Sequence, residues 1–249
     1  MLDAVTGITN QVDAGRIATL VTADTSKAFD SVRHDMLLDK LGWYGVDRHW
    51  FEDWLSHRCQ SVRGGSSNLV PITHGVVQGS VLGPVLFLIF TNDFASHISD
   101  SKVIMYADDT QFIDSDEPCN VYLLKIRIER SLATALTWFT QNGLKINPSK
   151  TEFLVFKTRR RIISEISIRF GDHTLVATSK AKVLGVVLDP SLTWEHHISL
   201  TVQRCYQVLV GICKLRNRLP RELRVFLIEA LVFPLIRYCA CVWGGACSI

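Results

Sequence analysis

Apolar and polar residues follow strand-like and helix-like patterns in turn along the first part of the chain. Residues 16–24, "RIATLVTAD", are rich in apolar and β-branched side chains and predict a buried strand. Residues 34–42, "HDMLLDKLG", predict a helix that ends at Gly42. Residues 47–58 predict a second helix, in which Asp47 caps the first turn.

Two hairpins are predicted beyond these helices. Residues 60–75 contain a Gly64-Gly65 turn between strand-like pieces. In "YADDTQF", apolar residues lie on both sides of Asp108 and Asp109, which places the two aspartates at the tip of a second hairpin.

The second half of the chain predicts a long helix, two strands and a helical tail. Residues 119–142 carry apolar side chains three or four positions apart, and residues 151–156 and 182–189 resemble strands. Pro220 opens the last predicted helix. The helix before it carries an apolar stripe of Ile198, Val202, Cys205, Leu209 and Ile212.

The order of these elements favours an α+β fold, with strands before residue 190 and helices after it. We therefore expect two regions, 1–190 and 191–249. Of the 249 residues, 47% are hydrophobic, which is enough for a substantial core, and the net charge is only +3.

Several function classes find no support in the composition. The seven cysteines form no CxxC pair, so neither a zinc site nor a disulfide framework is indicated, and we expect reduced, mostly buried thiols. The first residues lack the pattern of a signal peptide. The longest apolar run, residues 81–90, contains Gly83 and Pro84 and is shorter than the ~20 residues of a membrane span. An intracellular protein without a membrane partner is expected.

Basic residues are concentrated near the end of the chain. Between Arg204 and Arg224 there are six Lys or Arg residues and one acid, Glu222. This stretch is either an ordinary solvated helix face or a surface that binds phosphate backbones.

The adjacent carboxylates of Asp108 and Asp109 are the first candidate for chemistry. Aspartate is common in turns, so a purely structural role is one interpretation. In a cleft, however, two carboxylates repel each other unless a cation compensates their charge, and Mg²⁺ is such a cation. Asp24 ends the first predicted strand, where it is either a cap or a third ligand. Together with Asp108 it could bridge two metal ions about 4 Å apart for phosphoryl transfer.

Six stretches resemble, in order, the motifs of reverse transcriptases, most closely those of non-LTR (LINE-like) retrotransposons. "VTADTSKAFDSVRHDMLLDKL" resembles motif A, "HGVVQGSVLGPVLFLIFTNDF" motif B and "YADDTQF" motif C. "GLKINPSKTEFLVF" and "KVLGVVLDPSLTWEHHI" resemble motifs D and E, and "LVFPLIRYCACVWGG" resembles the end of the thumb. The resemblance implies a right-hand polymerase palm, an antiparallel sheet backed by helices, with partial fingers and a helical thumb-like C-terminal region.

The resemblance also implies roles for particular residues. Asp24, Asp108 and Asp109 match the aspartates that hold two Mg²⁺ ions, with Mn²⁺ as a substitute and Asp109 as the less direct ligand. Phe29 matches the aromatic residue that rejects a 2′-hydroxyl, although core packing would also explain it. Gln78 matches a residue near the incoming nucleotide and the template base.

The same motifs imply roles for four further groups of residues. Gly79 follows Gln78 in motif B, and Lys150 matches the motif D lysine that acts on pyrophosphate, unless it is a solvated loop residue. Leu184 and Gly185 match a hairpin that grips the primer, or belong to an ordinary strand. Basic residues that face nucleic acid in the family correspond to Arg58 and Arg63.

The chain departs from the family pattern in two respects. Val77 stands where motif B usually has proline, which loosens the loop that holds Gln78. Only 23 residues precede Asp24. We therefore expect a chain that lacks much of the fingers, the endonuclease and the zinc-knuckle region of its relatives, as a fragment or a decayed copy would.

Two functions follow from this comparison. The first is an RNA-directed DNA polymerase domain that extends a DNA primer on an RNA template with deoxynucleoside triphosphates. The second is a catalytically inactive nucleic-acid-binding relic. A nucleotidyl cyclase is disfavoured by the matches to motifs B, D and E. The family is found in the nucleus or the cytoplasm.

Overall fold

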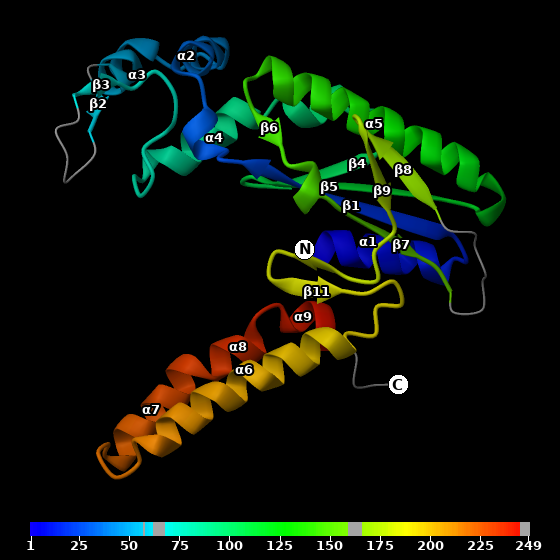
Figure 1. Cartoon of the computed structure of the whole chain (residues 1–249), viewed down its shortest axis with the longest axis vertical. Helices are drawn as coiled ribbons and strands as arrows, with labels where there is room; N and C mark the ends of the chain where they lie inside the picture. Colours follow the sequence, from blue (N-terminus) through cyan, green and yellow to red (C-terminus); the bar gives the residue numbers. More distant parts are fainter. Residues whose placement is uncertain (57, 62–67, 159–165, 245–249) are drawn as a thin grey trace.

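An antiparallel sheet forms the centre of the protein (Figure 1). This computed structural model describes residues 1–56, 58–61, 68–158 and 166–244. The central strand is β1 (Ile17–Ser26), which pairs with β5 (Asp109–Asp116) on one side and β7 (Glu152–Phe156) on the other. β4 (Lys102–Tyr106) extends the sheet beyond β5, and β6 (Lys145–Ile146) pairs with the last residues of β1. The strand predicted at 16–24 is confirmed and extends two residues further.

Both faces of the sheet are covered. Ile17 and Val21 of β1 pack in one cluster with α4 (Leu82–Thr91) and α5 (Val121–Gln141). Ala18 and Leu20 pack in another cluster, against α1 (Leu2–Asp13), the hairpin of β10 (Ala181–Val183) and β11 (Val186–Leu188), and the end of the chain. In Figure 1, α5 lies above the sheet and α1 and β11 lie below it. Burial on both faces explains why residues Ile17, Ala18, Leu20 and Val21 of β1 are apolar, without strict alternation of apolar and polar residues.

The segment between β1 and α4 carries the two predicted helices and the first hairpin. The short 3₁₀ helix η1 (Phe29–Ser31) leads into α2 (His34–Trp43) and α3 (Arg48–Leu55), and the Asp47 carboxylate accepts a hydrogen bond from the His49 amide at 3.0 Å. The predicted cap is therefore confirmed. β2 (Cys59–Gln60) and β3 (Val70–Pro71) pair as the predicted hairpin, whereas its Gly64-Gly65 turn lies outside the described residues.

The long predicted helix is α5, which ends at Gln141 just before Asn142-Gly143. The 3₁₀ helices η2 (Phe94–His97), η3 (Pro118–Asn120) and η4 (Pro148–Lys150) are short connections. β8 (Ser167–Phe170) and β9 (His173–Val176) form a hairpin that was not predicted. The chain reverses at Leu184 and Gly185 and forms the β10–β11 hairpin, so the hairpin implied by the resemblance is present and the alternative of an ordinary strand over 182–189 is wrong.

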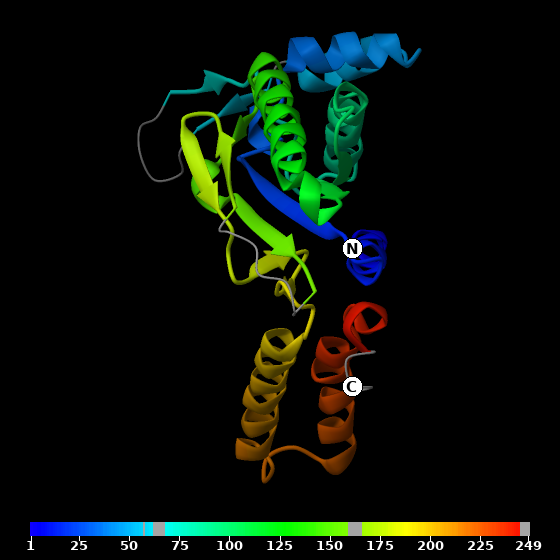
Figure 2. The same ribbon diagram turned by 90° about the vertical axis from the view of Figure 1, so that its right-hand side faces the viewer.

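Helices make up the described chain after residue 194. α6 (Glu195–Lys214) and α7 (Arg221–Leu231) form an antiparallel pair, followed by α8 (Phe233–Arg237) and α9 (Ala240–Trp243), and the group projects away from the sheet (Figure 2). The predicted stripe on α6 is wrong in part, since Val202 is 60% exposed. The α6 side chains that are buried are His197, Thr201, Cys205 and Ile212. Pro220 is the residue before α7 and not its first residue.

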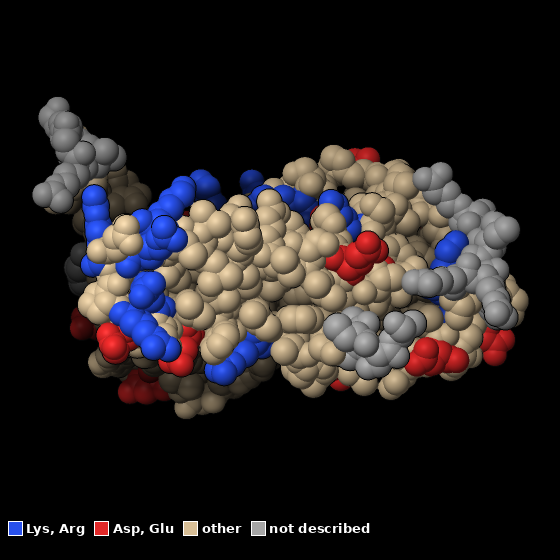
Figure 3. Space-filling model, turned by 90° about the horizontal axis from the view of Figure 1, so that it is seen from below, with Lys and Arg blue, Asp and Glu red and all other residues tan. Residues whose placement is uncertain are grey.

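The basic residues of this helical group are mostly exposed. Arg204, Lys214, Arg216, Arg218 and Arg221 are exposed, and Arg224 is half-buried. Figure 3, which views the molecule from the side of these helices, shows Lys and Arg gathered toward one end. No ion pair within the described part of the chain includes any of these six side chains.

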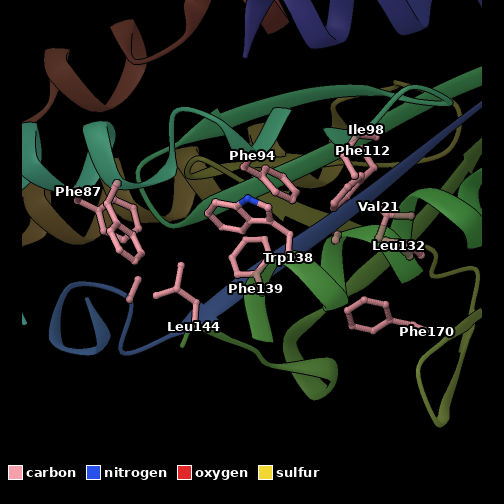
Figure 4. Packing of buried hydrophobic residues seen from close by; sticks show 14 of the residues in the cluster. Val21, Phe87, Phe94, Ile98, Phe112, Leu132, Trp138, Phe139, Leu144 and Phe170 are labelled. Carbon is pink, nitrogen blue, oxygen red and sulfur yellow. The ribbon is translucent and has the colours of Figure 1, made fainter. Parts of the chain in front are cut away.

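Aromatic rings fill the centre of the core between the sheet and α5 (Figure 4). The ring of Phe94 lies 5.0 Å from the rings of both Trp138 and Phe139, measured between centroids, and 6.3 Å from that of Phe112. These contacts are edge-on or tilted, as aromatic rings prefer. They fix α5 on the sheet behind the strands that carry the candidate site.

Most of the described cysteines lie at the surface. The described cysteines are free thiols, but the expectation that they are mostly buried is wrong, because only Cys205 is buried and Cys239 partly so. Cysteine is usually buried because it is apolar, yet four of these cysteines are exposed.

Among the described helices, none is both long and apolar enough to cross a membrane.

Candidate functional site

The pairing of β1 with β5 brings two of the predicted carboxylates together. Asp24 lies directly opposite Asp109 in the register. Opposite residues of an antiparallel pair point to the same face of the sheet. For Asp24 this is the face of Leu20, which packs toward the β10–β11 hairpin. Two acids from distant parts of the sequence therefore share one edge of the sheet.

Asp108 occupies the turn between β4 and β5. Tyr106 pairs with Asp109, so the turn consists of Ala107 and Asp108 alone. Ala107 has φ of 52°, in the left-handed region that L-residues rarely adopt. The Thr25 hydroxyl donates to the Asp108 carbonyl oxygen at 3.3 Å, which ties the turn to β1. Such a strained turn is typical of a functional site.

The carboxylates at this edge are poorly compensated. Partial burial, followed by the charges of Asp108 and Asp24, raises the pKa of Asp109 above its ordinary value. The ammonium group of Lys150 lies 3.0 Å from the Asp24 carboxylate, and Lys182 also lines the adjoining cavity. The raised pKa of Asp109 indicates that these cations leave its negative charge under-compensated, so the site favours additional positive charge.

Motif D is joined to motif A by backbone hydrogen bonds. β6 pairs with Thr25 and Ser26, and the Asn147 amide donates to the Asp24 carbonyl oxygen at 2.9 Å. The next turn, η4, ends at Lys150 and presents its side chain to Asp24. That side chain is 65% exposed, so the ion pair with Asp24 lies at the surface and is accessible to solvent.

A small polar cavity of about 200 Å³ lies beside these groups. Gln111, two residues after Asp109, lines it and is buried, yet neither its amide nitrogen nor its amide oxygen has a hydrogen-bond partner within the described part of the chain. The lining also includes Thr22, Asp24, Asp109, Lys150, Glu152, Lys182 and Leu184. Sequence reasoning missed Gln111, although the period of two along a strand places it on the same face as Asp109.

The donor set suits a hard divalent cation. Carboxylate oxygens are the ligands that Mg²⁺ prefers, and the raised pKa of Asp109 indicates that negative charge at this edge is under-compensated. Within residues 1–56, 58–61, 68–158 and 166–244, no three His, Cys, Asp or Glu side chains converge on one point as ligands would. The ion pair between Lys150 and Asp24 is the arrangement that a metal ion would have to replace.

Motif B lies beside the segment that follows Asp24. The Val76 amide donates to the Phe29 carbonyl oxygen at 2.8 Å, and the Gly75 amide to that of Val32 at 2.7 Å. A Cβ atom on Gly75 would lie 3.2 Å from the Asp30 backbone, so glycine permits this close approach. The two motifs therefore form one surface.

Phe29 and Gln78 are held on this surface. The Phe29 ring stacks on Phe87 of α4, with centroids 4.7 Å apart. The Gln78 amide donates to the Asp30 carboxylate at 2.7 Å, and Gly79 has φ of 80° next to open space. Asp30 was not singled out from the sequence, although it directly follows Phe29.

The loop without the usual proline has other restraints. The Ser80 hydroxyl donates to the Val77 carbonyl oxygen at 2.7 Å and accepts from the Gly83 amide at 2.9 Å. Together with the hydrogen bond from Gln78 to Asp30, these contacts restrain the loop. They act in place of the restraint that a proline at position 77 would give.

The residues predicted to contact nucleic acid lie in different parts of the structure. Arg58 stacks on Trp54, 4.2 Å from the ring centroid, and lines a groove with Asp30 and Val77. Arg63 lies outside the described residues. Leu184 lines the carboxylate cavity, and Gly185 is the second residue of the same turn. The structure thus brings Asp24, Asp109, Lys150 and Leu184 to one cavity. Arg58 lines a separate groove, and Gln78 is joined to it through the hydrogen bond to Asp30. Phe29 does not line either of these cavities but packs on Phe87.

Comparisons with known proteins show which family the chain resembles. Residues 4–188 match the family described as "Reverse transcriptase (RNA-dependent DNA polymerase)". The chain is 33% identical over 245 residues to the probable RNA-directed DNA polymerase from transposon BS of Drosophila melanogaster, covering 91% of this chain and 26% of the relative. It is 28% identical over 241 residues to the polymerase from mobile element jockey of the same species, covering 90% and 25%. The chain thus spans about a quarter of the length of these relatives.

Among solved structures, apo telomerase from Candida tropicalis has a similar fold. The TM-score is 0.52 at 11% sequence identity, and the match covers 76% of this chain and 34% of the telomerase chain. This likeness supports the right-hand polymerase fold predicted from the motifs. With residues 4–188 matched and a relative at 33% identity, the chain belongs to the reverse transcriptase (RNA-dependent DNA polymerase) family, as a domain of the type found in LINE-like elements.

Proposed function

We propose that the chain is the palm and thumb part of an RNA-directed DNA polymerase, which adds deoxynucleotides to a primer 3′-hydroxyl on an RNA template. The observation that carries the proposal is the pairing of Asp24 with Asp109 beside the Asp108 turn, with the pKa of Asp109 raised by burial and neighbouring charge. We assign the palm and partial fingers to 1–190 and the thumb-like region to 191–249.

The three aspartates would hold two Mg²⁺ ions. When bound, these ions activate the attacking hydroxyl and neutralise charge on the leaving pyrophosphate. Asp24 and Asp108 are the main ligands in this proposal, and Asp109 is the less direct one. Lys150, released from Asp24, would protonate or neutralise the pyrophosphate.

The surface that motifs A and B form together would select the nucleotide. The Phe29 ring has little freedom because Phe87 stacks on it, and a rigid ring excludes a 2′-hydroxyl by its bulk. Gln78 keeps its position near the nucleotide and the template base through Asp30. Arg58 and Arg63 would contact the nucleic acid, and Leu184 and Gly185 the primer.

Primer extension on an RNA template tests this function. We expect template-dependent extension that requires Mg²⁺ and falls by at least about 100-fold in Asp108→Ala, because metal-ion catalysis contributes several kcal/mol. Asp172→Ala is the matched control, since Asp172 is an exposed aspartate in the β8–β9 turn. Absence of extension by the wild type together with salt-sensitive RNA binding would refute catalysis by this chain and indicate a binding relic.

A further inference from the structure

The turn between β10 and β11 is strained at the edge of the carboxylate cavity. Leu184 has φ of 46° and Gly185 has φ of 84°, so both residues of the turn are left-handed. Glycine adopts this conformation readily, but for leucine it is costly, and it persists where the surroundings impose it. Leu184 also lines the cavity with Asp24 and Asp109. A contact that imposes this turn therefore acts next to the candidate catalytic groups.

Tyr238, which follows α8, makes that contact. Its hydroxyl donates to the Leu184 carbonyl oxygen at 2.6 Å, across 54 positions of sequence. Its ring lies over Gly185 so closely that a Cβ atom there would be 3.3 Å from the ring carbon Cε1. Gly185 is therefore needed both for its backbone angle and for the space that the ring occupies.

Tyr238 is itself held from behind. Its amide donates to the Pro234 carbonyl oxygen at 3.0 Å, and its own carbonyl oxygen accepts from the Trp243 indole at 2.9 Å. Cys239 then takes φ of 52°, which turns the chain back into α9. Leu184, Cys239 and Trp243 all pack against the cluster under the sheet.

The hydroxyl remains a donor at any ordinary assay pH. Partial burial, with the neighbouring Cys239 and Tyr106, raises the pKa of Tyr238 above its usual value. The bond to Leu184 is therefore present throughout the neutral range.

We propose that Tyr238 is a positioning residue that holds the Leu184-Gly185 turn beside the carboxylates and so couples the helical region to the 3′ end of a bound primer. This inference rests on the proposed polymerase function. The Tyr238 side chain links the helices that follow residue 194 to the turn that lines the cavity.

The test compares Tyr238→Phe with wild type. Phenylalanine keeps the ring over Gly185 and removes only the hydrogen bond, so the fold should be retained. Because a single hydrogen bond is removed, we expect the Kd for an RNA template annealed to a recessed DNA primer to rise about five-fold. The KM for deoxynucleoside triphosphates should be unchanged, and a peptide covering 181–188 should exchange its amide hydrogens faster.

Tyr122→Phe is the matched control, because Tyr122 on α5 is 73% exposed and its hydroxyl makes no hydrogen bond within the described part of the chain. Binding is measured by fluorescence anisotropy in EDTA, which requires no catalysis. An unchanged Kd and unchanged exchange in Tyr238→Phe would overturn the positioning role. A wild type that binds the primer–template without extending it would instead overturn the proposed catalysis and leave the role of Tyr238 standing.

Discussion

At the scale of single residues, the main feature is a concentration of like charge that the fold creates. Asp24 and Asp109 face each other across two strands, and Asp108 is adjacent in the turn. The raised pKa of Asp109 means that its charged form is disfavoured in the folded protein. The folded state therefore loses stability as the pH rises through that pKa, since the unfolded chain ionises at a lower pH.

Divalent cations should offset this loss. We expect Mg²⁺ at about ten times its Kd to stabilise the wild type by about 1.4 kcal/mol and to raise its melting temperature. In Asp109→Asn, stability without Mg²⁺ should be higher at pH 7, because one buried charge is removed, and the response to Mg²⁺ should be smaller.

Thermal unfolding followed by intrinsic fluorescence measures both effects. NaCl at the same ionic strength separates specific binding from screening. An equal Mg²⁺ response in wild type and Asp109→Asn would argue against a metal at this position.

At the scale of elements, α5 is joined to β5 by a network of charges as well as by its apolar face. Arg127 of α5 donates to Asp114 at 3.0 Å and to Asp116 at 2.7 Å. Hydrogen bonds from Asn120 and Arg127 lower the pKa of Asp116 to about 2, from an ordinary value of 3.8. Asp116 is buried, and its hydrogen bonds to Asn120 and Arg127 keep its carboxylate charged in the folded state and tie the helix to the strand.

The sign of the pH dependence follows from that lowered pKa. The stabilisation that Asp116 contributes is fully present above about pH 4 and is lost as the pH falls toward 2. The unfolded chain binds the proton near pH 3.8, whereas the folded protein binds it only near pH 2. We expect a loss of about 2 kcal/mol of unfolding free energy over this interval in wild type.

Urea unfolding at pH 5 and pH 2.5 measures the loss. In Asp116→Asn the part of the decrease that belongs to Asp116 should disappear. Asp39→Asn, a change at an exposed aspartate, should unfold with the pH dependence of the wild type. If Asp116→Asn retained the full decrease, the network would not be its source.

At the scale of the whole molecule, the protein consists of a sheet with covered faces and a helical group that projects from it (Figure 2). The exposed basic side chains of this group, between Arg204 and Arg221, have no acidic partners within the described part of the chain. If these cations bind a phosphate backbone, which is one of the two interpretations of this stretch, their removal should weaken the salt dependence of binding.

Salt dependence tests this surface. In the triple variant Arg216→Gln, Arg218→Gln, Arg221→Gln, the slope of log Kd against log salt should fall by roughly 0.7 to 0.9 for each phosphate that is no longer neutralised, which is about 2 for three phosphates. The control is Lys102→Gln with Arg130→Gln, because these cations are already paired with Asp3 and Asp100. Equal slopes for the triple variant and wild type would exclude these arginines from binding.

The sequence by itself determined several of the main elements and contained all of the motifs, but it did not predict α1, α4 or the β8–β9 hairpin. Apolar and β-branched residues identified β1, spacing of three and four identified α5, and Asp47 identified the start of α3, because these signals are local. The motif order pointed to the family, which the comparison over residues 4–188 bears out.

Only the tertiary structure decided which groups meet. The pairing of Asp24 with Asp109, the ion pair from Lys150 and the bond from Gln78 to Asp30 join residues 48 to 126 positions apart. The hairpin of β10 and β11, which the resemblance implied, meets Tyr238 more than 50 residues later, and the sequence did not predict this contact. A local pattern carries no information about such partners, since their contacts arise from packing of the whole chain.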